Sequence, residues 1–345
     1  MTTSLAPTDE SIAQLRTVAE KLLGAGAVTL ESIDGGRNSR VYRLRAASGC
    51  YAFKTYFRHA SDARARMDTE FGALRFLWDN GERRVPEPIV AGAQYDCAIY
   101  EWIEGERAGA GEISECDIHA ATDFLIRLRE WKDRPGTEHL RPASEACFSA
   151  RALVECLRGR LEPLLARTDH AELSDYLRRD LTPVLNEICA AAEMQLGGAF
   201  DRDLPDQFRT LSPSDFGFHN ALRRNGELVF LDFEYFGWDD PVKMICDFLL
   251  HPGMTASPEL KRLYAATLGR EFPEAAGRVP VFFPLFGLKW CLILLNEFLP
   301  AQLLRRKFAG MNERDIEARQ SEQLSKARSM LRVVLAGASH FPYGD

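Results

Sequence analysis

The stretch LSPSDFGFHNALRRNGELVFLDFEYFGWDDP, residues 211–241, places Asp215, Asn220 and Asp232 between apolar segments. Asn225-Gly226 separates two runs with the composition of strands, and this dipeptide is a strong signal for a two-residue hairpin turn. Such a hairpin brings Asn220 and Asp232 to the open ends of two paired strands, with Asp215 in the preceding loop. We therefore expect the three polar side chains to lie close together.

The spacing of these residues is typical of phosphoryl transfer. Asp215 and Asn220 stand in D-x-x-x-x-N spacing, and Asp232 follows the apolar run 229–231, as in the catalytic loop and metal-binding aspartate of kinases. One carboxylate can orient a hydroxyl, while an amide and a second carboxylate hold magnesium between phosphate oxygens. For each residue alone, a turn cap or a backbone partner is the simpler interpretation. The three in this order favour a phosphoryl-transfer site.

A second group of polar residues lies nearer the N-terminus. The stretch GGRNSRVYR, residues 35–43, has a glycine pair between two predicted strands, whereas a Rossmann turn or a P-loop requires glycines that open a helix. The pair indicates either an ordinary turn or a hairpin whose backbone amides approach a phosphate. Lys54 follows in the strand YAFKTYF, where its two neighbours face the opposite side. It is either a solvated lysine or a phosphate-binding ammonium held by Glu70 of the helix predicted over 60–79.

The composition fits an ordinary globular protein. The 345 residues are 46% hydrophobic and 27% charged, with a formal net charge of -7, which disfavours a nucleic-acid-binding surface. The eight cysteines form no C-x-x-C pair, so we expect reduced thiols without a zinc site or a disulfide framework. The N-terminus lacks the basic and apolar regions of a signal peptide, which favours the cytoplasm. Pro284, Lys289 and Glu297 interrupt the apolar run 279–300, so a buried helix is expected there and not a membrane span.

The order of predicted elements indicates two lobes of an α+β fold. An amphipathic helix at 9–23 leads into short strands of an antiparallel meander, and the chain becomes mostly helical after the glycine-rich segment GERAGAGE. We expect a small N-lobe with an antiparallel sheet at 1–103, and a larger helical C-lobe at 104–345 that starts with a linker at 104–113. The helices expected in the C-lobe cover 114–132, 148–167, 172–196, 257–268, 279–299 and 309–336.

In the order and spacing of these motifs the chain resembles the aminoglycoside phosphotransferase and choline kinase group of protein-kinase-like small-molecule kinases. The resemblance runs from GGRNSRVYR through AFK, DTEFGALRFL and AIYEWIEGE to SDFGFHNAL and LDFEYFGWDDP, and so covers most of the chain. It implies a two-lobed protein-kinase-like fold that binds ATP together with Mg²⁺.

The resemblance also implies roles for individual residues. Lys54 would contact the α and β phosphates of ATP and pair with Glu70. Asp215 would be the catalytic aspartate, and Asn220 and Asp232 would be magnesium ligands. The remaining nucleotide contacts would come from a loop over the phosphates and from the backbone of a hinge that binds adenine; these are Gly35, Gly36, Asn38 and Ser39, then Glu101 and Ile103.

Three positions depart from the family pattern or allow a second interpretation. Pro213 stands two residues before Asp215, where the family usually has a histidine that supports the loop, so the sequence leaves open how Asp215 is positioned. Glu234 occupies the glycine position of the D-F-G motif and would touch either a second metal or only the backbone. His219 could act as a base, but a polar loop residue is the simpler interpretation.

The segment after Asp232 bears on the kind of kinase. Asp240-Pro241 follows within a few residues and no A-P-E triplet occurs, which leaves no room for the activation segment on which a peptide would lie. We therefore expect a small-molecule acceptor with a hydroxyl group, such as a sugar, amino sugar or amino alcohol. The alternatives are a nucleotide-binding pseudokinase with a regulatory or scaffolding role, and a protein kinase. The helix at 279–299 is a candidate wall of the acceptor pocket, through Lys289, Trp290, Asn296 and Glu297.

Overall fold

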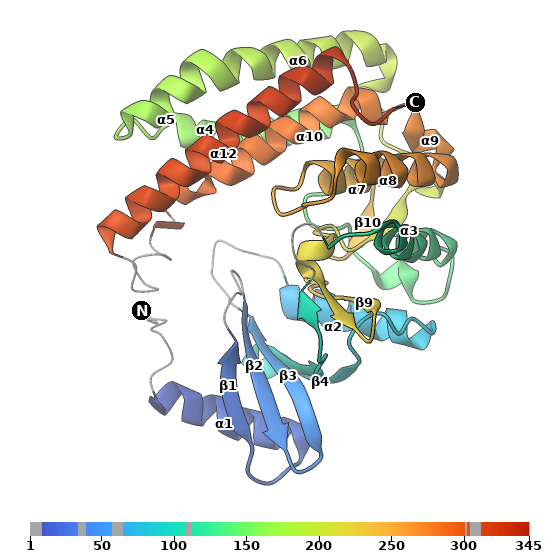
Figure 1. Ribbon diagram of the computed structural model, residues 1–345, viewed down its shortest axis with the longest axis vertical. Helices are drawn as coiled ribbons and strands as arrows, with labels where there is room; N and C mark the ends of the chain where they lie inside the picture. The colour runs from blue at the N-terminus through green and yellow to red at the C-terminus, as the bar shows by residue number, and fades with distance from the viewer. Residues whose placement is uncertain are drawn as a thin grey trace.

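The computed structural model describes residues 9–33, 39–56, 65–107, 112–300, 302–303 and 312–344, and shows two lobes of unequal size (Figure 1). A five-stranded antiparallel sheet forms the N-lobe, with strand order β1-β2-β3-β5-β4. Helix α1 (Asp9–Leu23) lies along this sheet, and helix α2 (Arg66–Asp79) packs against β4 and β5. The strands are β1 (Thr29–Ile33), β2 (Ser39–Ala46), β3 (Gly49–Tyr56), β4 (Pro88–Gly92) and β5 (Cys97–Glu101).

The two faces of the sheet have different partners. Phe53 of β3 is fully buried in a cluster that includes Ala19 of α1 and Tyr42 of β2. The next residue, Lys54, points to the other face, where its Nζ reaches Glu70 of α2. The period-two alternation of β3 therefore separates the core face from the face that carries Lys54, as the sequence predicts.

The N-lobe elements lie close to their predicted bounds. Helix α1 has the bounds of the predicted helix, and the meander is confirmed by the antiparallel pairing of β1 with β2 and of β2 with β3. Helix α2 begins at Arg66, later than predicted, and residues 57–64 lie outside the described part of the chain.

The hairpin predicted from Asn225-Gly226 is present. Strand β8 (Ala221–Arg224) pairs antiparallel with β9 (Glu227–Phe230), and the two turn residues have φ angles of 54° and 87°. Both angles lie in the left-handed region that a type I′ turn requires and that Asn and Gly adopt at low cost. Strand β6 (Glu106–Arg107) adds a third strand by pairing with β8. The boundary at residue 103 remains a prediction.

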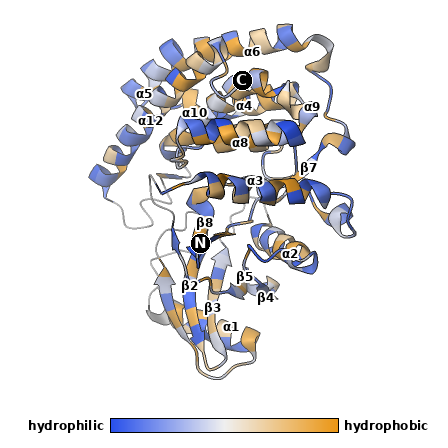
Figure 2. Cartoon of the chain, turned by 45° about the vertical axis from the view of Figure 1, so that its right-hand side comes forward, coloured by the Kyte–Doolittle hydropathy of each residue, from blue (hydrophilic) through white to orange (hydrophobic). Residues whose placement is uncertain are grey.

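The C-lobe is mostly helical. Helices α10 (Val279–Leu294) and α12 (Glu313–Ser339) pack side by side (Figure 1). With the turn that follows it, α10 is long and apolar enough to cross a membrane, but 72% of its most apolar window is buried inside the protein, so it is the core helix that the sequence predicts. Hydrophilic and hydrophobic residues alternate along α3 and α8 (Figure 2), as in surface helices. The other helices are α3 (Glu115–Glu130), α4 (Ala150–Leu165), α5 (Ala171–Asp175), α6 (Thr182–Leu196), α7 (Pro241–Leu250), α8 (Pro258–Glu271) and α9 (Pro273–Ala276).

Helix α7 is an element that the sequence patterns do not predict. Asp240 caps its N-terminus by accepting a hydrogen bond from the Val242 N–H at 2.9 Å, and Pro241 occupies the first turn. Nine of its ten residues are buried, and a short apolar run of this kind fits a buried strand as well as a helix. Just before α7, strand β10 (Gly237–Asp239) pairs with β7 (Thr210–Ser212), which brings the two ends of the stretch 211–241 together.

Candidate active site

Lys54 connects the two lobes at a cluster of carboxylates. Its Nζ lies 2.7 Å from Oε2 of Glu70 and 2.7 Å from Oδ1 of Asp232, a residue 178 positions further along the chain. The side chain of Lys54 is only 8% exposed, so it is not a solvated lysine. The Tyr56 hydroxyl donates to the same Glu70 oxygen at 2.6 Å. The structure therefore brings Lys54, Glu70 and Asp232 together.

The charges in this cluster shift each other's pKa values. Burial by itself lowers the pKa of Lys54, but the carboxylates of Glu70, Asp232 and Glu234 outweigh it and raise that pKa well above the ordinary value. Burial raises the pKa of Glu70, and the attraction of Lys54 offsets part of this shift. Lys54 is therefore a permanent ammonium at neutral pH.

Asp232 presents the exposed carboxylate of the cluster. Its side chain is 38% exposed, and its φ of 67° is unusual for a residue other than glycine, a kind of backbone strain that is frequent at functional sites. Oxygens of Glu70, Asp232 and Glu234 lie within 4.8 Å of one another. Carboxylate oxygens are the ligands that Mg²⁺ prefers, so the donor set at Asp232 fits this ion.

Glu234 is buried behind Asp232. Its carboxylate lies 3.5 Å from Nε of Arg66 and 3.9 Å from Nζ of Lys54. These two contacts are ion pairs with side chains, and the contact with a metal or with the backbone that the sequence suggests stays a prediction. The ion pairs link α2 to the segment after β9.

A buried lysine holds the loop that carries Asp215. Ser214 has a φ of 67°, and its hydroxyl accepts a hydrogen bond from Nζ of Lys243 at 2.7 Å. Lys243 is 1% exposed and forms an ion pair with Asp239 at 2.6 Å. The loop is thus anchored through Ser214, although Pro213 stands at the place of the histidine usual in the family.

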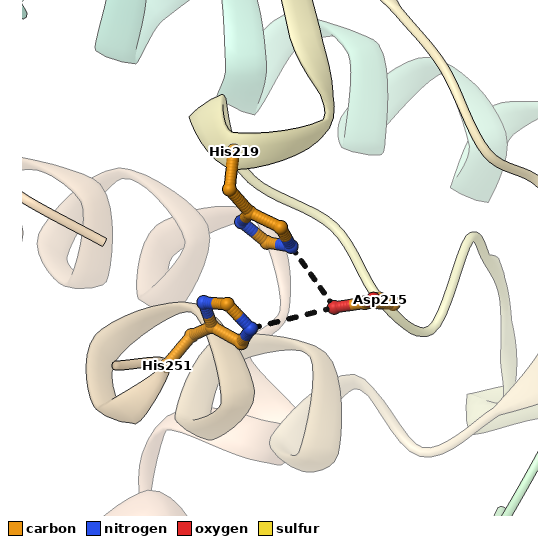
Figure 3. Close-up of side chains that lie close together, drawn as sticks. All are labelled: Asp215, His219 and His251. Atoms are coloured by element: carbon orange, nitrogen blue, oxygen red, sulfur yellow. Dashed lines mark hydrogen bonds and ion pairs between the residues drawn. The ribbon is translucent and has the colours of Figure 1, made fainter. Parts of the chain in front are cut away.

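Two stacked imidazoles face Asp215 (Figure 3). Nε2 of His219 lies 3.0 Å from Oδ1 of Asp215, and Nε2 of His251 lies 3.7 Å from the same oxygen. The ring centroids are 3.8 Å apart and the planes differ by 11°. Burial raises the pKa of Asp215, but the hydrogen bond from His219 and the attraction of both imidazoles bring it below the ordinary value.

The sequence interpretation misses this histidine pair. An ordinary loop role for His219 overlooks its contact with Asp215, and His251, directly after α7, carries no motif that marks it. The only sequence signal is that His219 lies four residues after Asp215 in the same loop. His251 lies near Asp215 because of the way the chain turns at α7, and short-range sequence patterns do not reveal this turn.

Asn220 lies between Asp215 and the hairpin. Its Nδ2 donates to the backbone oxygen of Asp215 at 3.0 Å, and its own backbone oxygen accepts from the Leu231 N–H at 2.8 Å. The second bond places Asn220 beside Asp232 at the open end of the hairpin, as expected. The carboxylate of Asp232 turns toward Lys54.

The structure describes some of the predicted nucleotide-binding residues and not others. The N–H of Glu101 donates to the Glu87 oxygen at 2.8 Å and is not available to a ligand, while the N–H of Ile103 takes part in no backbone hydrogen bond among the described residues. Ser39 starts β2, opposite Tyr56 of β3. The other predicted residues of this loop, Gly35, Gly36 and Asn38, lie outside the described part of the chain.

A cavity of about 810 Å³ opens beside Asp215, a volume typical of small-molecule sites. Its lining carries charges of both signs. Glu145 forms ion pairs with Arg160 and with Lys289, whose Nζ is 3.2 Å away, and burial lowers the pKa of Lys289. The four residues predicted as a wall all line the cavity: Lys289, Trp290, Asn296 and Glu297.

Comparison with known proteins identifies the family. The model of the phosphotransferase enzyme family matches residues 29–278. Among curated proteins, none matches the sequence. Among solved structures, a spectinomycin phosphotransferase in complex with ADP and spectinomycin is 15% identical, with a TM-score of 0.60 over 94% of this chain and 98% of that one. The choline kinase LicA from Streptococcus pneumoniae is 13% identical, with a TM-score of 0.62 over 94% and 100%. A choline kinase from Cryptosporidium parvum is 13% identical, with a TM-score of 0.58 over 92% and 94%.

These likenesses show the two-lobed protein-kinase-like fold, and the family match covers well over half of the chain. The chain belongs to the phosphotransferase enzyme family and is an ATP-dependent phosphotransferase that acts on an alcohol group.

Proposed function

We propose that this protein is a small-molecule kinase that transfers the γ-phosphate of ATP, bound with Mg²⁺, to a hydroxyl of a sugar, amino sugar or amino alcohol. The observation that carries this proposal is the position of Lys54, 2.7 Å from both Glu70 and Asp232. The ammonium of Lys54 is a fixed positive charge on the N-lobe, and its contact with Asp232 brings it to the predicted metal-binding aspartate of the C-lobe. Phosphoryl transfer requires this arrangement.

The N-lobe residues bind the nucleotide in this proposal. Lys54 contacts the α and β phosphates while Glu70 holds its ammonium in place. The backbone of Glu101 and Ile103 binds the adenine edge, and the N–H of Ile103 has no backbone partner among the described residues. The loop over the phosphates comprises Gly35, Gly36, Asn38 and Ser39.

Asn220 and Asp232 are the proposed magnesium ligands. Amide and carboxylate oxygens suit this hard cation, and Asp232 is the exposed carboxylate of its cluster. Mg²⁺ held by these two residues would neutralise charge on the phosphate oxygens.

Asp215 orients the acceptor hydroxyl and accepts its proton. Because its pKa is lowered, Asp215 stays ionised at neutral pH and is a weak base, so the proton moves late, after the acceptor oxygen has begun to bond to the γ-phosphorus and the bond to ADP has begun to break. Catalysis then depends mainly on positioning and on charge stabilisation.

The segment after Asp232 and the cavity beside Asp215 suit a small-molecule acceptor better than a peptide. Only eight residues separate Asp232 from the start of α7 at Pro241, so no platform for a peptide follows the metal-binding aspartate. The cavity beside Asp215 has the size of a small-molecule site, and its polar lining suits a molecule with several hydroxyls. The eight cysteines are free thiols, which supports a reducing compartment such as the cytoplasm.

Asp215→Ala tests this proposal. Turnover with MgATP and a pool of hydroxyl acceptors is expected to disappear. The affinity for MgATP is expected to stay within about two-fold, because the hydrogen bond from Asn220 goes to the backbone oxygen of Asp215, which alanine keeps. Turnover that survives the substitution contradicts the proposed role. No turnover of any acceptor in the pool by the unaltered protein contradicts the proposed acceptor class.

A further inference from the structure

The carboxylate of Asp215 forms a hydrogen bond with the imidazole of His219. His219 Nε2 is 3.0 Å from Oδ1, which is the distance of a hydrogen bond, whereas His251 Nε2 is 3.7 Å away and too far for one. A carboxylate oxygen only accepts, so Nε2 of His219 carries the proton. Both imidazole contacts converge on Oδ1 of this carboxylate.

The ring of His219 is held by a stack of aromatic groups. His251 lies face to face with it at 3.8 Å, and Trp290 of α10 meets His251 edge-on at 4.7 Å and 86°. Trp290 is fixed in turn by a hydrogen bond from its Nε1 to Asp247 at 2.9 Å. The orientation of His219 is therefore set by the wall of the acceptor cavity.

A transition-metal site is the other chemistry that Asp215, His219 and His251 could support, because their ligand atoms lie within 4.8 Å of one another. The hydrogen bonds argue against it. The N–H of Gly253 donates to Nδ1 of His251 at 3.0 Å, so in the neutral ring Nε2 is protonated and cannot ligate. Metal-binding histidines usually donate their other N–H to an acceptor, but Nδ1 of His219 is buried with no partner among the described residues. Two nearly parallel rings also do not direct their lone pairs at one point.

We propose that His219 is a positioning residue: its Nε2–H holds Oδ1 of Asp215 so that Oδ2 faces the acceptor hydroxyl, and His251 fixes the plane of the His219 ring. This supplies from the C-terminal side of Asp215 the support that Pro213, on its N-terminal side, cannot give. His219 exchanges no proton with the substrate, since the acceptor proton passes to Asp215. The inference rests on the proposed function of Asp215.

The first test compares two substitutions of one residue. His219→Phe keeps an aromatic ring for the stack with His251 but removes the donor, and kcat is expected to fall about 10- to 100-fold with the KM for MgATP within about two-fold. His219→Gln keeps an N–H donor and is expected to recover part of this loss. His139→Phe is the matched control, because the side chain of His139 is 83% exposed and lies outside the site.

Fold stability is not expected to account for the loss. The buried Nδ1 of His219 has no described partner, so His219→Phe removes an unsatisfied polar atom. Urea denaturation of each variant checks this expectation. A kcat of His219→Phe within about two-fold of the unaltered protein overturns the inference, as does an equal loss in His219→Gln and His219→Phe.

A second readout does not depend on turnover. Nitrogen-15 NMR of the histidine rings distinguishes the two neutral tautomers, and His219 is expected to carry its proton on Nε2. A proton on Nδ1 overturns the inference. The proposed function fails separately, if turnover survives in Asp215→Ala or if none occurs in the unaltered protein, and the tautomer still tests the geometry in that case.

Discussion

Removing the buried charge of Lys243 should both destabilise the C-lobe and loosen the loop of Asp215. Its Nζ contacts Oδ2 of Asp239 at 2.6 Å, Oγ of Ser214 at 2.7 Å and a carboxylate oxygen of Asp247 at 3.5 Å. Lys243→Met has a similar length and leaves little cavity, so the main change is electrostatic. It leaves the fully buried Asp239 without its cation, and such an unpaired charge costs about 3–5 kcal/mol of unfolding free energy.

The dependence of this loss on pH follows from Asp239. Burial raises its pKa and Lys243 lowers it, so without Lys243 the pKa rises further above that of the unfolded chain. The folded variant then binds a proton that the unfolded chain has already released. Its stability is greatest at acidic pH and falls as the pH rises through the raised pKa. The destabilisation should therefore be smaller at mildly acidic than at alkaline pH.

Urea denaturation followed by circular dichroism measures both effects. Asp239→Asn in the Lys243→Met background removes the unpaired charge and should restore most of the stability. Lys326→Met is the matched control, because the ion pair of Lys326 with Glu322 is exposed and worth less than about 1 kcal/mol. A loss below about 1 kcal/mol for Lys243→Met, or a loss that is the same at all pH values, refutes the reasoning.

Three further changes have defined outcomes. Lys54→Met should weaken MgATP binding at least about ten-fold in calorimetry, because a charged contact to phosphate is lost, and unaltered affinity would contradict the proposed nucleotide site. Burial raises the pKa of Glu82, but hydrogen bonds from Arg84 bring this pKa below the ordinary 4.5. The stability that ionised Glu82 contributes is therefore present above pH 4.5, and it is lost as the pH falls through the pKa of Glu82 in the folded protein. Glu82→Gln should give a shallower loss of stability in acid, and acid denaturation curves that run parallel would rule this out. Chelating Mg²⁺ should abolish turnover without changing fold stability, and turnover in excess chelator would remove the role given to Asn220 and Asp232.

Local sequence rules predict those features that depend on neighbouring residues. The opposite facing of Phe53 and Lys54 follows from strand alternation, and it places Lys54 on the side of α2. The hairpin follows from Asn225-Gly226, because this pair adopts the left-handed turn at little cost. The order of motifs along the chain then suffices to predict the two-lobed fold.

Features that depend on tertiary contacts are not predicted. His251 meets Asp215 only because α7 turns the chain back toward the loop, and α7 itself is a short, mostly buried apolar run. No sequence motif marks Lys243, and its burial beside Asp239 makes it an anchor of the loop. In both cases the role of the residue depends on contacts with residues far away in the sequence, and local sequence patterns do not reveal such contacts.

Phosphorus NMR on the protein with MgATP and pooled sugars, amino sugars and amino alcohols, run beside Asp215→Ala, tests the central claim most directly. The account predicts a new phosphate monoester with the unaltered protein and none with the variant, and dividing the pool then identifies the acceptor. A monoester formed equally by both proteins would contradict the assignment of Asp215 as the catalytic aspartate.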